Sequence, residues 1–231
     1  TEPAGSGFLR RLGLAILVAV AVLLRGMSGA FGAASPFVAI AAVVIVALAA
    51  RPLLPPGTLH AGRGLPSVIL LRGLIAGALF GAEVYVPYLM IDRYGFSPTW
   101  AGLGLTTAAL AWAVSANIQG RYGDRIGNRR IVLIGATLLT IATVTAALCS
   151  LTFAHPAILI AGWTLSGAGV GLIYSRLTVL TLAYSTPSNQ GFNSSALSIS
   201  DSTGAAVTIA VMGLVFTAFV GTGWEFPAVF G

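Results

Sequence analysis

The residue best suited to chemistry in this sequence is Glu83, an acid within a long apolar segment. It lies sixteen residues into a predicted membrane span, 67–91, with no arginine within two helical turns. An ionised carboxylate near the middle of a membrane is costly, so such a group faces a cavity or a partner and often titrates. Pro87 lacks the N–H that would bond the Glu83 carbonyl, so the helix is expected to open locally beside the acid. Glu83 is therefore a candidate proton carrier or cation-binding group. The alternative is a protonated carboxyl that hydrogen-bonds a neighbouring helix for structure alone.

Residues around Glu83 predict a lined cavity. Phe80 and Pro87 share its helical face, and two tyrosines lie close by in the sequence. The predicted cavity residues are Phe80, Tyr85, Pro87 and Tyr88.

Two further charges, Arg176 and Asp201, lie inside apolar segments, each within about two turns of the same predicted membrane face. Pairing with each other would relieve both charges, and both are candidates for proton or substrate coupling. Each charge could equally be stabilised without the other. Arg176 could extend its side chain to the interface, and Asp201 could be stabilised by the dipole at its helix N-terminus.

The segment 120–130, GRYGDRIGNRR, is a charged stretch between two apolar runs. It predicts a tight turn at a membrane face, and its arginines predict that this face is cytoplasmic. Its three glycines suit a sharp reversal with positive φ. An ordinary basic loop would explain the arginines, but it would not explain Asp124 or the glycine spacing.

Composition places the chain in a membrane. Of its 231 residues, 57% are hydrophobic and 8% are charged, whereas soluble domains carry about 25% charged residues. The net charge of +6 does not indicate nucleic acid, because the arginines lie at the ends of apolar segments and no basic run contains interleaved aromatics. With one cysteine, no metal-ligand cluster, no catalytic set and no phosphate loop, we expect neither an enzyme nor a cofactor.

The fold expected is an all-α polytopic membrane protein of about seven transmembrane helices. Glycines at four-residue spacing, Gly73, Gly77 and Gly81, predict close packing of the third span against another helix. Alternation along the chain makes 51–66 and 120–130 cytoplasmic, in agreement with the arginines. The predicted spans are 8–24, 31–50, 67–91, 99–119, 131–151, 157–183 and 196–220.

The pattern G-x-x-x-D-R-x-G-x-R-R in 120–130 resembles the signature loop of the major facilitator superfamily, between the second and third helices of a six-helix lobe. Two stretches, 80–87 and 190–201, also resemble drug exporters of this superfamily. Asn128 departs from the pattern, which usually has a basic residue there, and Tyr122 stands where Leu is frequent.

This resemblance implies three parts. Residues 67–231 are similar to five helices of a C-terminal lobe, 51–66 would be a cytoplasmic loop, and 1–50 would hold two helices. Those two helices are similar to the linker pair of fourteen-helix drug–proton antiporters or to the end of an N-terminal lobe. The chain thus resembles a fragment of the fold, without most of the N-terminal lobe and without the last helix.

The resemblance also implies a function: secondary transport by alternating access in the cell membrane, most similar to proton-coupled efflux of small lipophilic compounds. Its partners would be membrane lipid, a small-molecule substrate, protons and the missing N-terminal lobe. The charged segment would be the gating loop, whose contacts hold one access state. Its residues would be Gly120, Gly123, Asp124, Arg125, Gly127, Arg129 and Arg130. Uptake of a polar metabolite and a non-transporting membrane scaffold are the alternatives.

Overall fold

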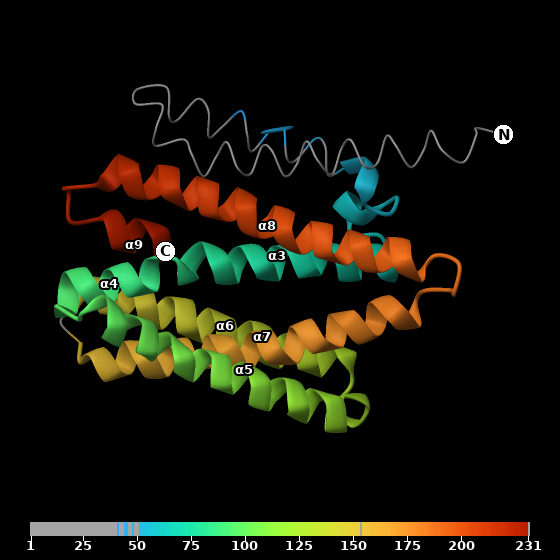
Figure 1. Ribbon diagram of the computed structural model, residues 1–231, viewed down its shortest axis with the longest axis horizontal. Coiled ribbons are helices and arrows are strands. Elements are labelled where there is room, and N and C mark those ends of the chain that lie inside the picture. The colour runs from blue at the N-terminus through green and yellow to red at the C-terminus, as the bar shows by residue number, and fades with distance from the viewer. Residues whose placement is uncertain (1–40, 42–43, 46–47, 49–50, 153, 231) are drawn as a thin grey trace. The chain divides into compact units, whose positions relative to one another are not determined.

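The computed structural model describes residues 41, 44–45, 48, 51–152 and 154–230. The predicted span 8–24 lies outside these residues, and so does most of the predicted span 31–50. Every regular element in the described part is a helix, which confirms the all-α class (Figure 1). The elements are η2 (Arg51–Leu53), η3 (Thr58–His60), α3 (Leu65–Glu83), α4 (Tyr85–Tyr94), α5 (Pro98–Ile126), α6 (Asn128–Leu151), α7 (Pro156–Ala183), α8 (Gln190–Phe219) and α9 (Glu225–Phe230).

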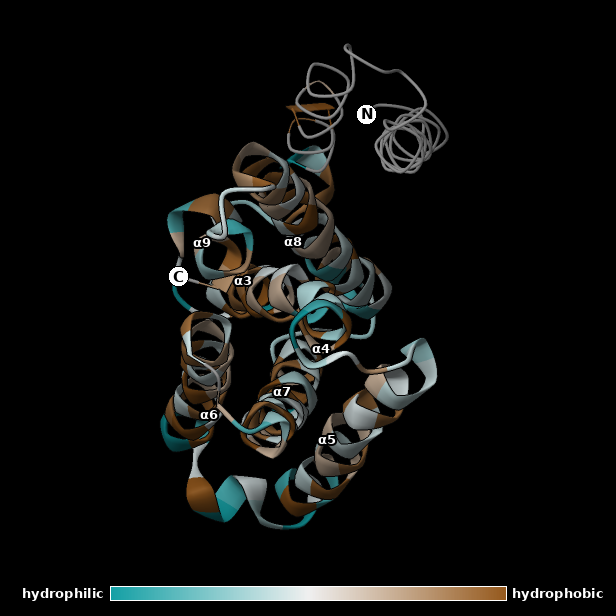
Figure 2. Ribbon diagram, turned by 90° about the vertical axis from the view of Figure 1, so that its left-hand side faces the viewer, coloured by the Kyte–Doolittle hydropathy of each residue, from teal (hydrophilic) through white to brown (hydrophobic). Residues whose placement is uncertain are grey.

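Five helical stretches are long and apolar enough to cross a membrane: α3 with α4, then α5, α6, α7 and α8. They coincide with the five spans predicted from residue 67 onward. Hydrophobic residues run along all of these helices, as Figure 2 shows. Large apolar side chains such as Leu74, Leu110 and Val114 are more than half exposed. A helix that is apolar on all sides is typical of a span whose outer face contacts lipid.

Two helices extend further than predicted. The helix α5 continues seven residues beyond Gln119, to Ile126, and α8 begins at Gln190 instead of Ala196. Polar residues continue a helix outside the hydrocarbon because backbone hydrogen bonding does not require apolar side chains. The loop before α8 is correspondingly short.

The predicted third span, 67–91, is interrupted at Val84, between the end of α3 at Glu83 and the start of α4 at Tyr85. Val84 keeps right-handed helical angles, φ −58° and ψ −34°, so the chain direction continues. The interruption lies where Pro87 provides no N–H for the preceding turn. The helix is therefore interrupted for one residue beside Glu83, where the opening was expected, and the opening itself stays a prediction.

The chain divides into two compact units, Thr1–Gly77 with Leu180–Leu214, and Ala78–Val179 with Val215–Gly231. In the first unit, α3 packs closely on α8. A Cβ atom added to Gly204 would overlap the Gly73 carbonyl, and one added to Gly77 would overlap the Thr208 hydroxyl. The predicted small-residue packing of the third span is therefore confirmed at Gly73 and Gly77.

In the second unit, α7 packs on α5 and α6 through its own glycines. A Cβ on Gly167 would overlap the backbone of Ala108 in α5, and one on Gly169 would lie 2.5 Å from the Gly135 carbonyl oxygen in α6. Trp163 is buried in this unit, with 1% of its surface exposed. These glycines serve helix packing, which is how van der Waals contact stabilises helices in lipid.

Candidate functional site

The charged segment 120–130 is mostly helical, so the prediction of a loop with three turn-forming glycines is wrong. Gly120 and Gly123 lie within α5, and α6 begins at Asn128. Gly127 alone separates the helices, with φ +86° and ψ 150°, and its N–H donates to the Gly123 carbonyl at 2.9 Å. One residue with positive φ is enough to reverse the chain here. The predicted gating role of the segment stays a prediction.

Gly123 has a packing role instead of a turn role. It is buried on α5, and a Cβ added there would lie 2.5 Å from Gln119 Nε2 and 3.4 Å from Arg176 Nη1. The absence of a side chain lets the Arg176 guanidinium of α7 approach the backbone of α5.

Arg176 joins α7 to the end of α5 and the start of α6, all within the second unit. Its Nη1 donates to Asp124 Oδ1 of α5 at 2.8 Å, and its Nε donates to Asn128 Oδ1 of α6. The Arg176 side chain is 10% exposed, whereas that of Asp124 is 92% exposed. A buried guanidinium is thus neutralised by a carboxylate that stays in contact with solvent.

The contact with Arg176 explains why Asn128 can stand where the family pattern usually has a basic residue. A basic residue at this position would place a second positive charge beside Arg176, whereas the amide oxygen of Asn128 accepts a hydrogen bond from it. The Asn128 and Asp124 acceptors both come from the charged segment, so the structure connects this segment to the charge within α7.

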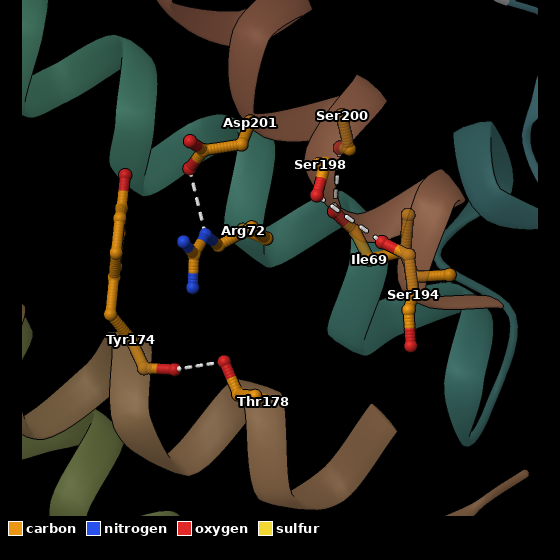
Figure 3. A network of polar contacts seen from close by, with 8 residues as sticks. All are labelled: Ile69, Arg72, Tyr174, Thr178, Ser194, Ser198, Ser200 and Asp201. Carbon is orange, nitrogen blue, oxygen red and sulfur yellow. Dashed lines mark hydrogen bonds and ion pairs between the residues drawn. The ribbon is translucent and has the colours of Figure 1, made fainter. Parts of the chain in front are cut away.

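The suggested pairing of Arg176 with Asp201 is wrong, because each has another partner. Asp201 Oδ1 accepts from Arg72 Nε at 2.7 Å, in an ion pair within the first unit (Figure 3). The side chains of Arg72 and Asp201 are 16% and 24% exposed. The sequence reasoning missed Arg72 as a site residue, although its depth is a usable signal. Arg72 and Asp201 each lie five residues into a predicted span.

Several hydroxyl-bearing residues precede or follow Asp201 along α8, and two of them donate to backbone carbonyls. Ser200 Oγ donates to the Ile69 carbonyl of α3 at 2.7 Å, and Ser198 Oγ donates to the Ser194 carbonyl at 3.3 Å (Figure 3). Thr203 Oγ1 is buried and has no hydrogen-bond partner among the described residues. The Ser200 bond fixes α8 against α3 next to the ion pair.

Glu83 is partly buried at the end of α3. No hydrogen bond or ion pair connects it to another residue of the described part. The alternative structural role, a bond to a neighbouring helix, therefore has no counterpart among the described residues. The transport role of Glu83 stays a prediction.

The four predicted cavity residues differ in their surroundings. Tyr85 is buried, with its ring centroid 5.1 Å from that of Phe216, which in turn lies 5.5 Å from the ring of Phe226. Tyr88 is 59% exposed, and Phe80 and Pro87 are partly buried. Tyr85 thus belongs to an aromatic cluster of the second unit, and the cavity itself stays a prediction. Within the described residues, no three His, Cys, Asp or Glu side chains gather as metal ligands.

The family model described as the Major Facilitator Superfamily matches residues 67–231. The multidrug efflux pump SdrM of Staphylococcus aureus is 23% identical over 165 residues, covering 71% of this chain and 36% of that protein. The citrate-proton symporter of Salmonella typhi is 29% identical over 168 residues, covering 66% of this chain and 38% of that protein. The multidrug export protein EmrB of Escherichia coli is 36% identical over 53 residues, 23% of this chain and 10% of EmrB. The chain therefore spans little more than a third of the length of the first two relatives.

Proposed function

Because the chain belongs to the major facilitator superfamily, we propose that it is part of a secondary transporter that exports small lipophilic compounds in exchange for protons. The observation that carries this proposal is Glu83, a partly buried acid within a membrane span that has no ion-pair partner among the described residues. The similarity to SdrM and EmrB, both named as multidrug exporters, supports the direction and the substrate class.

Glu83 is the proton-exchanging group in this proposal. An acid within a span is retained where it serves a proton or substrate pathway, because its charged form is costly there. The break in the helix at Val84 supports the role, since an open backbone carbonyl beside the acid adds an acceptor for water or for a cationic substrate. Phe80 and Tyr88 would then form apolar walls for a lipophilic compound.

Asp124 and Arg176 form the gate in this proposal, together with Arg125, Arg129 and Arg130. The Arg176 contacts hold the end of α5 and the start of α6 against α7 in the state observed. Since Asp124 is exposed, a competing charge or a movement of the ends of α5 and α6 can break its contact with Arg176. Such a contact can differ between the two access states, which is what gating of an alternating-access transporter requires.

Arg72 and Asp201 form a second coupling element. Asp201 is compensated by Arg72 in the structure, so protonation of Asp201 would break this ion pair. This makes the pair suited to exchange a proton against a charged group of a substrate. Asp201 is thus a coupling residue that acts with Arg72, not with Arg176.

A second candidate function is proton-coupled uptake of a carboxylate-bearing metabolite. The similarity to the citrate-proton symporter favours it, and so do the two arginines, Arg72 and Arg176, that lie in membrane spans. In both candidates, the complete transporter comprises an N-terminal lobe, lies in the cell membrane and has residues 120–130 on the cytoplasmic side.

The test uses the full-length protein that contains this chain, reconstituted in proteoliposomes with an imposed pH gradient. Lumenal pH is followed while lipophilic cations, neutral drugs and citrate are added separately. We expect drug-dependent proton movement that is lost in Glu83→Gln and kept in the matched control Asp92→Asn, which removes an exposed acid at the end of α4.

The other outcomes separate the alternatives. Drug-dependent movement that persists in Glu83→Gln would contradict the role of Glu83 while keeping the exporter. Movement with citrate alone would replace export by uptake. No movement with any compound, from protein that elutes as a single folded species, would favour a membrane scaffold.

A further inference from the structure

The segment 51–64, which precedes the first described span, is a folded loop with internal hydrogen bonds. Leu54 N–H donates to the Arg51 carbonyl at 3.3 Å, and Gly62 N–H donates to the Gly57 carbonyl at 3.0 Å. Thr58 is buried, and its hydroxyl donates to the Pro55 carbonyl at 2.7 Å. Prolines at three positions restrict φ in addition. The loop therefore presents its side chains from a defined backbone.

The surface of this loop has an open hollow of about 350 Å³. Arg51 and His60 contribute two nitrogen-bearing side chains to its lining, and both residues are exposed. Most of the remaining lining is apolar and comes from Pro52, Leu54, Pro55 and Leu59. The hollow thus combines the positive charge of Arg51 and the imidazole of His60 with apolar walls.

The basic residues around the hollow have no acidic residue near them in the sequence. Arg63, close by in the same loop, is also exposed, and the sequence has no acid between Arg51 and Glu83. Asp201, the acid of α8 within the same unit, is already paired with Arg72. Guanidinium groups are always charged, so the loop attracts anions at every physiological pH.

The loop is also held at the beginning of a membrane span. Leu53 is 5% exposed, and Leu54 and Leu65 pack against the buried cluster of Ile69, Ala196 and Leu197 on α3 and α8. α3 begins at Leu65, immediately after the loop. The hollow therefore lies where lipid headgroups meet the helix end.

We propose that this hollow binds the headgroup of an anionic phospholipid. Arg51 and His60 would contact the phosphate, Arg63 would strengthen the local positive potential, and the proline and leucine walls would cover the glycerol and the first acyl carbons. Basic residues next to a span attract anionic lipids in this way. A soluble phosphate compound would use the same two side chains but would gain nothing from the apolar walls, so the chemistry favours the lipid.

The experiment measures lipid retention by the full-length protein with native mass spectrometry. The protein is released from micelles that contain equal amounts of dioleoylphosphatidylglycerol and dioleoylphosphatidylcholine. We expect the wild-type protein to retain the anionic lipid several-fold over the neutral one. The double variant Arg51→Gln/His60→Gln should lose most of this preference, whereas the charge-keeping variant Arg51→Lys/His60→Arg should keep it.

The control is Arg121→Gln, which removes an exposed arginine at the end of α5 outside the loop. If Arg121→Gln reduces the preference as much as the double variant does, attraction is a property of the whole surface and the proposal fails. Retention unchanged in the double variant would also overturn it. In a separate arm, glycerol 3-phosphate is added at the lipid concentration; if it displaces the anionic lipid, the site belongs to a soluble anion and not to the membrane.

Discussion

Replacement of Gly204 by Ala tests the close packing of α3 on α8, which positions Arg72 and Asp201. A Cβ on Gly204 would lie 2.6 Å from the Gly73 carbonyl carbon and 2.9 Å from the Gly73 Cα, besides overlapping the carbonyl oxygen. These are backbone atoms, so no side-chain rotation can relieve the contact. The two helices must separate.

The cost follows from the contacts that separation changes. Overpacking of a tight contact costs about 1–3 kcal/mol. Weakening the Ser200–Ile69 hydrogen bond, 2.7 Å long, adds about 1 kcal/mol. The higher helix propensity of Ala offsets about 0.5–1 kcal/mol. We therefore expect a net loss of about 1–3 kcal/mol in unfolding free energy, which lowers the melting temperature by several degrees.

The matched control is Gly102→Ala in α5, where an added Cβ would meet no atom within 4 Å. This substitution should stabilise by up to about 1 kcal/mol, because it gains helix propensity without a clash. Thermal unfolding of both variants in the same detergent is the measurement. Equal melting temperatures for Gly204→Ala and Gly102→Ala would refute the close contact between α3 and α8.

Three further predictions concern the second unit. Gly127→Ala should lower the unfolding free energy by about 1–3 kcal/mol, because φ +86° with ψ 150° is almost exclusive to glycine. Gly120→Ala, with open space around its added Cβ, should be neutral or stabilising. Thermal unfolding compares the two variants, and equal effects would contradict a turn made by Gly127 alone. A double-mutant cycle of Asp124→Asn and Arg176→Gln should give a coupling below about 1 kcal/mol that decreases with added salt, because Asp124 is exposed; a coupling unaffected by salt would argue against this pair. Pro87→Ala should restore the missing N–H, join α3 to α4 and slow amide hydrogen exchange around Val84, and unchanged exchange would show that the break has another cause.

The spans from residue 67 onward could be predicted from the sequence, because hydropathy reports which residues enter hydrocarbon. The helix ends could not be predicted in the same way. α5 contains Arg121, Asp124 and Arg125, which belong to water at a membrane face but are compatible with helical backbone. Charge therefore marks the membrane boundary, whereas the end of the helix depends on the one residue, Gly127, that adopts positive φ.

The role of each glycine is less predictable than its presence. Gly120, Gly123 and Gly127 share one segment, which predicts the same turn role for all three, yet each has a different environment. Gly120 has open space around it, Gly123 contacts Arg176, and Gly127 forms the turn. The sequence contains the residue type, but the surface facing each glycine depends on helices that are distant in the chain.

The partners of the buried charges follow from helix packing more than from depth. Depth alone makes Asp201 a reasonable partner for Arg176. The contact of Gly73 with Ser200, however, brings the neighbouring residues Arg72 and Asp201 together. In lipid, helices approach most closely where small residues meet, so an arginine next to such a contact pairs with the acid on the helix packed there.

The second unit follows the same logic along a different helix pair. Gly171 brings α7 against Trp112 and Ser115 of α5, and further along both helices Arg176 reaches Gly123 and Asp124. A charge on a small-residue face should therefore be assigned first to the acid on the helix that this face contacts. By this rule the Gly73–Gly77 spacing identifies Arg72 as a buried partner for an acid, because Arg72 adjoins the packing face.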